Sequence, residues 1–153
     1  KQLQNYNHML ADGQAIFEAT PQNLLHILKA VKADLQKTSN RLESHIRENS
    51  SSWLDTKADD VFYYQQGKIY AYFLLLKALS FDFKDAILQS NIYQPWTSLL
   101  KSLENAAHLS PTIVRNGELD SLLAPNHLAS LGFYSRKAII TLQKMLTTLD
   151  GVK

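Results

Sequence analysis

The most apolar stretch of the chain lies near its middle, between Asp59 and Phe83. All eight residues from Ile69 to Leu76 are apolar or aromatic, so a helix over this stretch is apolar on every side. A surface helix has one apolar stripe, whereas a helix that is apolar all round is buried. The run lies between Lys68 and Lys77, far short of the roughly 20 apolar residues that cross a bilayer. The pattern therefore predicts the buried central helix of a helical domain.

Apolar residues on both sides of this stretch recur every three or four positions, the spacing of amphipathic helices. The spacing predicts further helices over residues 1–19, 21–48, 83–89 and 91–109, and a last helix that begins at Pro125 or Asn126. Thr20 suits the cap of the second of these helices, and Pro21 suits its first position. Three stripes are expected to face the core: Leu24, Leu28, Val31, Leu35, Thr38, Leu42 and His45/Ile46; then Trp96, Leu99, Leu100, Leu103 and Ala107; then Leu128, Leu131, Ser135, Ala138, Leu142, Met145 and Leu149.

Two segments are expected to be loops. Residues 49–55 contain three consecutive serines, and the helical spacing fails around residues 110–124, where Asn116-Gly117 signals a tight turn. Long helices with short connections favour an antiparallel bundle. We therefore predict one all-α domain over residues 1–153, an antiparallel bundle of five or six helices with an irregular loop around residues 110–124.

Three of the five glycines, Gly13, Gly67 and Gly132, fall inside predicted helices. Each costs about 1 kcal/mol there relative to alanine. Because a residue without a side chain allows a neighbouring helix to approach closely, we expect Gly67 to lie at a close helix crossing. The alternative is a kink or hinge.

Charge and composition exclude several kinds of function. The 16 basic and 14 acidic residues give a net charge of +2, and Arg136-Lys137 is the only adjacent basic pair. No basic run therefore indicates nucleic acid or an anionic membrane as a partner. The absence of cysteine excludes disulfides, thiolate metal sites and cysteine nucleophiles. No signal peptide or membrane span is recognisable, but the chain opens at Lys1, so an anchor upstream would not be visible.

Motifs for catalysis are also missing. No serine stands in a nucleophile motif, no glycine-rich loop is suited to phosphate, and no two of the five histidines are spaced four apart. We expect no catalytic residue, cofactor or metal. If the central and last helices pack together, several polar residues would form one network, which we interpret as structural: Asp60, Tyr64, Arg115, Asn116, Asn126, His127 and Arg136. The aromatic residues between Phe62 and Phe73 either belong to the core or line an apolar ligand cavity.

Three strings of this sequence resemble an uncharacterised proteobacterial family of inner-membrane proteins: ADDVFYYQQGKIYAYFLLLKAL (58–79), NG (116–117) and PNHLASLGFYSRKA (125–138). A fourth, YNHMLADGQAIFEATPQNLL (6–25), is similar to the preceding family segment in its alphaproteobacterial form. The resemblance covers most of the chain and implies the C-terminal half of a family member. It also implies a single N-terminal membrane anchor upstream and a soluble part that faces the periplasm. The family supplies no activity, so no site residue is carried over.

Three functions stay open at this point. The leading hypothesis is a non-enzymatic interaction or scaffolding domain with an unknown protein partner. The first alternative is a binder of an apolar ligand such as a lipid, and the second is an enzyme of unrecognised type. An open apolar cavity would favour the ligand, and a closed core would favour the protein partner.

Overall fold

The computed structural model describes residues 2–49, 57–110 and 127–151. These residues form six helices and no strand: α1 (Gln2–Ala11), α2 (Pro21–Glu48), α3 (Ala58–Asp82), α4 (Lys84–Gln89), α5 (Tyr93–Ala107) and α6 (His127–Asp150). The predicted all-α class is confirmed. The predicted loops at 49–55 and 110–124 lie almost entirely outside the described residues.

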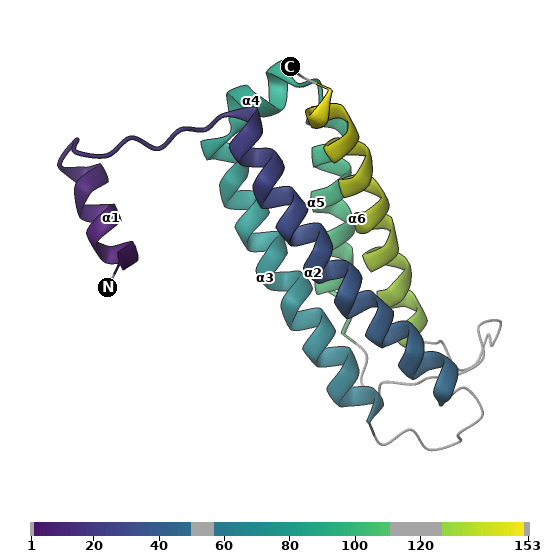
Figure 1. The fold of residues 1–153 in the computed structure, drawn as a ribbon. Coiled ribbons are helices and arrows are strands. Elements are labelled where there is room, and N and C mark those ends of the chain that lie inside the picture. The colour runs from purple at the N-terminus through teal and green to yellow at the C-terminus, as the bar shows by residue number, and fades with distance from the viewer. Residues whose placement is uncertain (1, 50–56, 111–126, 152–153) are drawn as a thin grey trace.

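Four long helices, α2, α3, α5 and α6, form the bundle (Figure 1). They alternate in direction along the chain, and the short α4 turns the chain between α3 and α5 at one end. Each long helix packs against two neighbours, in the cycle α2–α3–α5–α6. The predicted antiparallel bundle is therefore confirmed.

The core is made by the stripes that the spacing predicted. Every predicted stripe residue of α6 is buried, as are those of α2 from Leu24 to Leu42, while His45 and Ile46 at its end are half-buried. In α5, Trp96, Leu99 and Leu103 are buried. Burial of these side chains is the main force that holds the helices together, because it removes apolar surface from water.

Polar side chains close two helix ends. The Thr20 hydroxyl accepts the backbone N–H of Asn23 at 3.2 Å, which confirms the predicted cap of α2. From α3, the Gln66 amide donates to the carbonyl oxygens of Ala107 (3.2 Å) and Leu109 at the end of α5. Carbonyl groups at a helix end have no partner within the helix, so this bond ties α3 to the end of α5.

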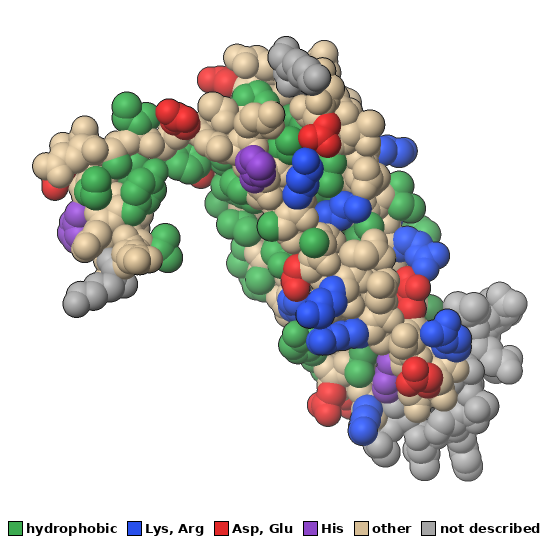
Figure 2. Space-filling model, in the orientation of Figure 1, with side chains coloured by type: hydrophobic (Ala, Val, Ile, Leu, Met, Phe, Trp, Pro, Cys, Tyr) green, Lys and Arg blue, Asp and Glu red, His purple; other side chains and the backbone are tan. Residues whose placement is uncertain are grey.

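The first helix differs from its prediction. The spacing predicted a helix over residues 1–19, but α1 ends at Ala11 and contacts no other helix of the described chain. Gly13 adopts a left-handed φ of 68°, and the N–H groups of Gln14 and Ala15 both donate to the Met9 carbonyl (2.7 and 2.9 Å). Gly13 therefore ends α1 rather than lying inside it, because a left-handed residue closes a helix. The segment stands off the bundle as an arm (Figures 1 and 2).

The central helix α3 is buried on one side only, so the prediction that it is buried all round is wrong. Phe62, Ile69 and Leu76 are fully buried, but Tyr70 is 49% exposed and Leu74 is 47% exposed. A helix in a four-helix ring contacts two neighbours, and its outer face stays open unless another element covers it.

The close crossing predicted at Gly67 is absent. A Cβ built on Gly67 meets no heavy atom within 4 Å, because this residue lies on the open outer face of α3. A Cβ on Gly132 meets only the Leu42 side chain, at 3.6 Å, which is an ordinary contact between α6 and α2.

Gly67→Ala should therefore raise the free energy of unfolding by up to about 1 kcal/mol, the difference in helix propensity between the two residues. Chemical denaturation followed by circular dichroism measures this difference. A destabilised variant would show that something does pack closely at Gly67.

Candidate functional site

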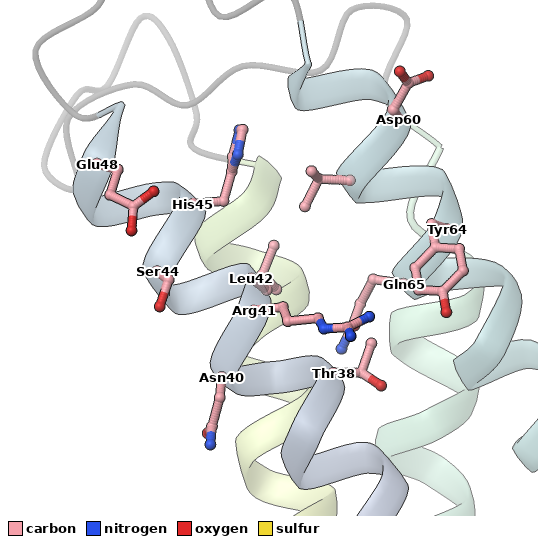
Figure 3. Close-up of a pocket in the computed structure, with 11 residues that line it drawn as sticks. Thr38, Asn40, Arg41, Leu42, Ser44, His45, Glu48, Asp60, Tyr64 and Gln65 are labelled. Carbon is pink, nitrogen blue, oxygen red and sulfur yellow. The ribbon is translucent and has the colours of Figure 1, made fainter.

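A pocket of about 680 Å³ lies between the C-terminal half of α2 and the first turns of α3 (Figure 3). Its lining surface is mostly apolar and includes Leu42, Val61 and Tyr64, although most of the lining residues are polar or charged. The size falls within the range of small-molecule sites, roughly 300–1,000 Å³. The remaining lining residues are Thr38, Asn40, Arg41, Ser44, His45, Glu48, Asp60 and Gln65.

Charged groups stand on opposite walls of the pocket. Arg41 extends from α2 toward α3, and Asp60 stands in the first turn of α3 (Figure 3). Arg41 makes no ion pair within the described chain. An unpaired guanidinium at the mouth of a pocket suits an anionic group on a ligand, since it offers several donors in a planar fork.

A buried acceptor in the pocket wall also lacks a partner. Gln65 is 1% exposed, and its Nε2 donates to the Ser135 hydroxyl of α6 at 3.3 Å. Its Oε1 accepts no hydrogen bond in the described structure. An unpaired buried polar atom costs roughly 1–3 kcal/mol of stability. A hydrogen-bond donor that reached Gln65 Oε1 would remove this cost.

The pocket shows no arrangement for nucleophilic catalysis. Ser44 and His45 are neighbours on α2 and point in different directions (Figure 3). His45 Nδ1 lies 3.4 Å from Asn49 Nδ2. A nucleophile needs its base within hydrogen-bond reach, and this pair does not provide it.

The structure brings together only part of the predicted polar network. Asp60 and Tyr64 both line the pocket. Arg136 lies elsewhere, because its guanidinium pairs with Glu43 of α2 at 2.7 Å, across the α2–α6 contact. Arg136 therefore has a partner on α2 in the described structure, and the network as a whole stays a prediction. α6 packs mainly against α2 and α5, while α3 lies diagonally across the bundle.

The remaining members of the predicted network give no further evidence for or against it. Arg115, Asn116 and Asn126 lie outside the described residues. His127 is the first residue of α6 and is half-buried.

Sequence reasoning missed a polar cluster beside the pocket, which joins α2 to α3. Asp34 of α2 accepts a 2.7 Å hydrogen bond from the Tyr72 hydroxyl and pairs with Lys68 at 2.5 Å. Lys68 also donates to the Thr38 hydroxyl at 3.1 Å. The sequence did contain one signal: Lys68 and Tyr72 are four residues apart in an apolar helix, so their side chains share a face. The partner on α2 had no comparable signal.

These contacts shift two pKa values in opposite directions. The hydrogen bond from Lys68, and then that from Tyr72, hold the pKa of Asp34 below its ordinary value. Burial, and then the bond to Asp34, raise the pKa of Tyr72 to about 12. Asp34 therefore stabilises the fold above pH 4, and this contribution is lost as the pH falls through its lowered pKa. Tyr72 stabilises the fold below pH 10, and its contribution is lost as the pH rises toward 12.

Tyr72→Phe should lower the free energy of unfolding by about 1 kcal/mol at neutral pH, because it removes the hydrogen bond to Asp34. The difference from the parent should shrink between pH 10 and about 12, where the parent tyrosine loses its proton. Denaturation curves across this range measure the effect. Tyr70→Phe is the matched control, since the exposed Tyr70 of the same helix makes no hydrogen bond in the described chain. An equal loss in both variants would contradict the prediction.

The outer side of α3 carries the second candidate site, a continuous apolar surface that we call the α3 face. None of its residues is charged and all are exposed, with Phe81 78% and Tyr63 52% exposed. At 100° per residue they fall within one side of the helix. Hydrophobic side chains gather along this edge of the bundle, on the side where the arm lies (Figure 2). The α3 face consists of Tyr63, Gly67, Tyr70, Ala71, Leu74, Leu75, Ala78 and Phe81.

Metal binding and membrane insertion were the two remaining kinds of site to consider in the described residues, and neither has the groups it needs there. Within the described ranges, no three histidine, aspartate or glutamate side chains gather as metal ligands would. No helix in the same ranges has the length and apolar character needed to cross a bilayer.

The comparisons with known proteins give one match. The family model for an "Uncharacterized protein conserved in bacteria (DUF2333)" matches residues 14–148. The matched region includes the pocket and the α3 face and begins after α1. No curated protein and no solved structure matches the chain. Because the match covers most of the sequence, this chain belongs to the DUF2333 family of uncharacterised bacterial proteins.

Proposed function

We propose that this chain is a non-enzymatic interaction domain, and that the α3 face is the surface that contacts a protein partner. The observation that supports this is the exposure of large apolar side chains side by side on one helix. Taking about 200 Å² for a large side chain, Tyr63, Tyr70, Leu74, Leu75 and Phe81 expose roughly 500 Å². The largest apolar patch on a typical monomer has about this size and is often a functional surface.

The physical reason lies in the cost of leaving such a face in water. Apolar surface contributes about 25 cal/mol for each Å² removed from water. A helix that served only the bundle would carry polar residues on its outer side, as α2 does with Lys29 and Lys37. A partner surface accounts for the uncharged outer side of α3.

The proposal places this domain in a membrane-anchored protein of the bacterial envelope, with the domain on the periplasmic side of the inner membrane. Support comes from the resemblance of residues 58–79 and 125–138 to inner-membrane proteins that carry one N-terminal span. Protease protection in spheroplasts tests the location. Cleavage of the domain by protease added outside is expected, and protection until the inner membrane is opened would contradict it.

Site-specific photo-cross-linking in the full-length protein tests the interaction. A photoreactive residue at Leu74 should give a discrete protein adduct in membranes. The same residue at Ile140, which is 52% exposed on α6, is the control and should not give that adduct. Identical adducts from both positions, or none from Leu74, would contradict a partner surface on α3.

A second candidate function rests on the pocket between α2 and α3. The unpaired Arg41 and the unpartnered Gln65 Oε1 favour a small polar ligand with an anionic group and a hydrogen-bond donor. Most of the lining surface is apolar, so the ligand can also carry an apolar part, and the apolar ligand among the hypotheses from sequence stays open.

A thermal-shift screen of small carboxylates and phosphates tests this candidate, because a ligand that binds the folded state raises the melting temperature. The shift should vanish in Arg41→Ala. The control is Arg47→Ala, which removes an exposed arginine of α2 outside the pocket lining. A shift that survives in Arg41→Ala would place binding elsewhere.

A further inference from the structure

We infer that the α3 face binds the α1 arm of a second copy of this chain, so that two copies exchange arms in a symmetric dimer. The inference rests on the proposed function, since it names the partner of the same face. It is carried by two uncovered apolar surfaces on one molecule, the arm and the α3 face, and by the contacts that hold them apart.

The arm presents apolar side chains that no helix of the described chain covers. Leu3 is 78% exposed, Ile16 is 80% exposed, and Tyr6 and Met9 are each about two-fifths exposed. No residue of α1 is buried. A ten-residue helix is too short to be stable alone in water, and helices of this length depend on packing of an apolar side. The arm therefore requires a surface to pack against.

Local contacts hold the arm away from its own α3. The turn at Gly13 closes α1, and the Tyr6 hydroxyl donates to the Ile16 carbonyl at 3.4 Å, which ties the helix to the segment that follows it. The Phe17 ring then packs edge-on against Phe83, with centroids 5.6 Å apart, and anchors that segment at the end of α3. Open space separates α1 from the bundle (Figure 2).

The two surfaces match in character. Residues 2–11 of the arm contain no Lys, Arg, Asp or Glu, and the α3 face contains none either. An uncharged helix packs on an uncharged face without burying an unpaired charge, which would be costly. Each copy carries both surfaces. A dimer with one twofold axis therefore packs each arm on the α3 face of the other copy and leaves neither surface open to a third copy.

A stable dimer interface needs more buried area than the α3 face provides alone, so it also needs the arm. The roughly 500 Å² of the α3 face alone falls short of the ~800 Å² that each partner buries in a standard interface. The large apolar side chains of the arm and its linker, Leu3, Tyr6, Met9, Ile16 and Phe17, expose a similar area. Reciprocal exchange therefore offers each copy about 1,000 Å², enough for a stable dimer.

Molar mass in solution gives the first test. The full chain should elute in size-exclusion chromatography with light scattering at twice the monomer mass, and Leu74→Glu and Met9→Glu should each elute as a monomer. Ile140→Glu is the matched control, because it places the same charge at an equally exposed apolar position on α6 and should leave the dimer intact. A monomeric parent, or a dimer that survives both α3-face and arm variants, overturns the inference.

Cross-linking decides between exchange and folding back. Because the chain has no cysteine, Met9→Cys and Leu74→Cys can be made singly and mixed as a long-tagged and an untagged protein. A short bismaleimide should join one tagged and one untagged chain. A link that forms only in the double variant, within one chain, shows that the arm covers its own α3 and overturns the inference.

The outcomes also separate this inference from the proposed function. If the chain is monomeric but Leu74 still gives an adduct with a different protein in membranes, arm exchange fails while the interaction domain stands. If Leu74 gives no specific adduct with any protein, including a second copy, both fail.

Discussion

Leu76→Ala should lower the free energy of unfolding by about 2–5 kcal/mol, whereas Leu74→Ala should change it by less than about 1 kcal/mol. Both substitutions remove the same atoms from the same helix, two positions apart. Leu76 is fully buried and Leu74 is 47% exposed. The first variant leaves a cavity in the core, and the second removes surface that water already reaches.

Urea denaturation followed by circular dichroism measures both values at a protein concentration low enough for the parent chain to be monomeric. At that concentration the assembly makes no contribution to stability. Equal losses in the two variants would show that the outer side of α3 is packed within the monomer, and the α3 face would then not exist as a free surface.

Trp96→Ala should lower the free energy of unfolding by about 3–5 kcal/mol, a large part of the total stability of a domain of this size. Trp96 is 2% exposed, and its Nε1 donates to the Ser80 hydroxyl at 2.8 Å. Ser80 in turn donates to the Leu76 carbonyl at 3.0 Å. The indole therefore fills the core at the α4 end of the bundle and ties α5 to the end of α3.

Two variants separate volume from hydrogen bonding. Trp96→Phe keeps most of the ring volume and should recover more than half of the loss, with about 1–2 kcal/mol remaining for the smaller ring and the lost bond to Ser80. Tyr93→Ala, at a 55% exposed position of the same helix, should cost little. A loss in Trp96→Phe as large as in Trp96→Ala would assign the effect to the hydrogen bond instead of to packing.

The interaction domain and the arm exchange both depend on one feature, the outer side of α3. The same helix supplies Phe62, Ile69 and Leu76 to the core and Tyr70 and Leu74 to the outer face. A substitution on its inner side changes folding, and one on its outer side is expected to change association. The two kinds of experiment therefore report on different sides of one helix.

Most of the fold was predictable from the spacing of apolar residues. The stripe of α2 from Leu24 to Leu42 and that of α6 from Leu128 to Leu149 have the helical period, and one apolar stripe can be buried in only one way. Thr20 and Pro21 located the start of α2 because capping is a local interaction between residues close in sequence.

The exposure of α3 was not predictable in this way. From Ile69 to Leu76 every position is apolar, so the period carries no information about which side faces the core. Neighbours from α2 and α5 decide this, and they come from other parts of the chain. The role of Gly67 depended on the same packing, since a Cβ at this outer position meets no heavy atom of the described chain within 4 Å.

Sequence by itself determined the helical class, the order of the bundle helices and the core stripes of α2, α5 and α6, because periodicity and capping act over a few residues. Tertiary structure alone decided three things: which side of α3 is open, that Arg136 pairs with Glu43 rather than with Asp60, and that Asp34 meets Lys68 and Tyr72. Each of these depends on which helices become neighbours. The packing of the whole chain decides which helices become neighbours, and no local sequence pattern indicates this.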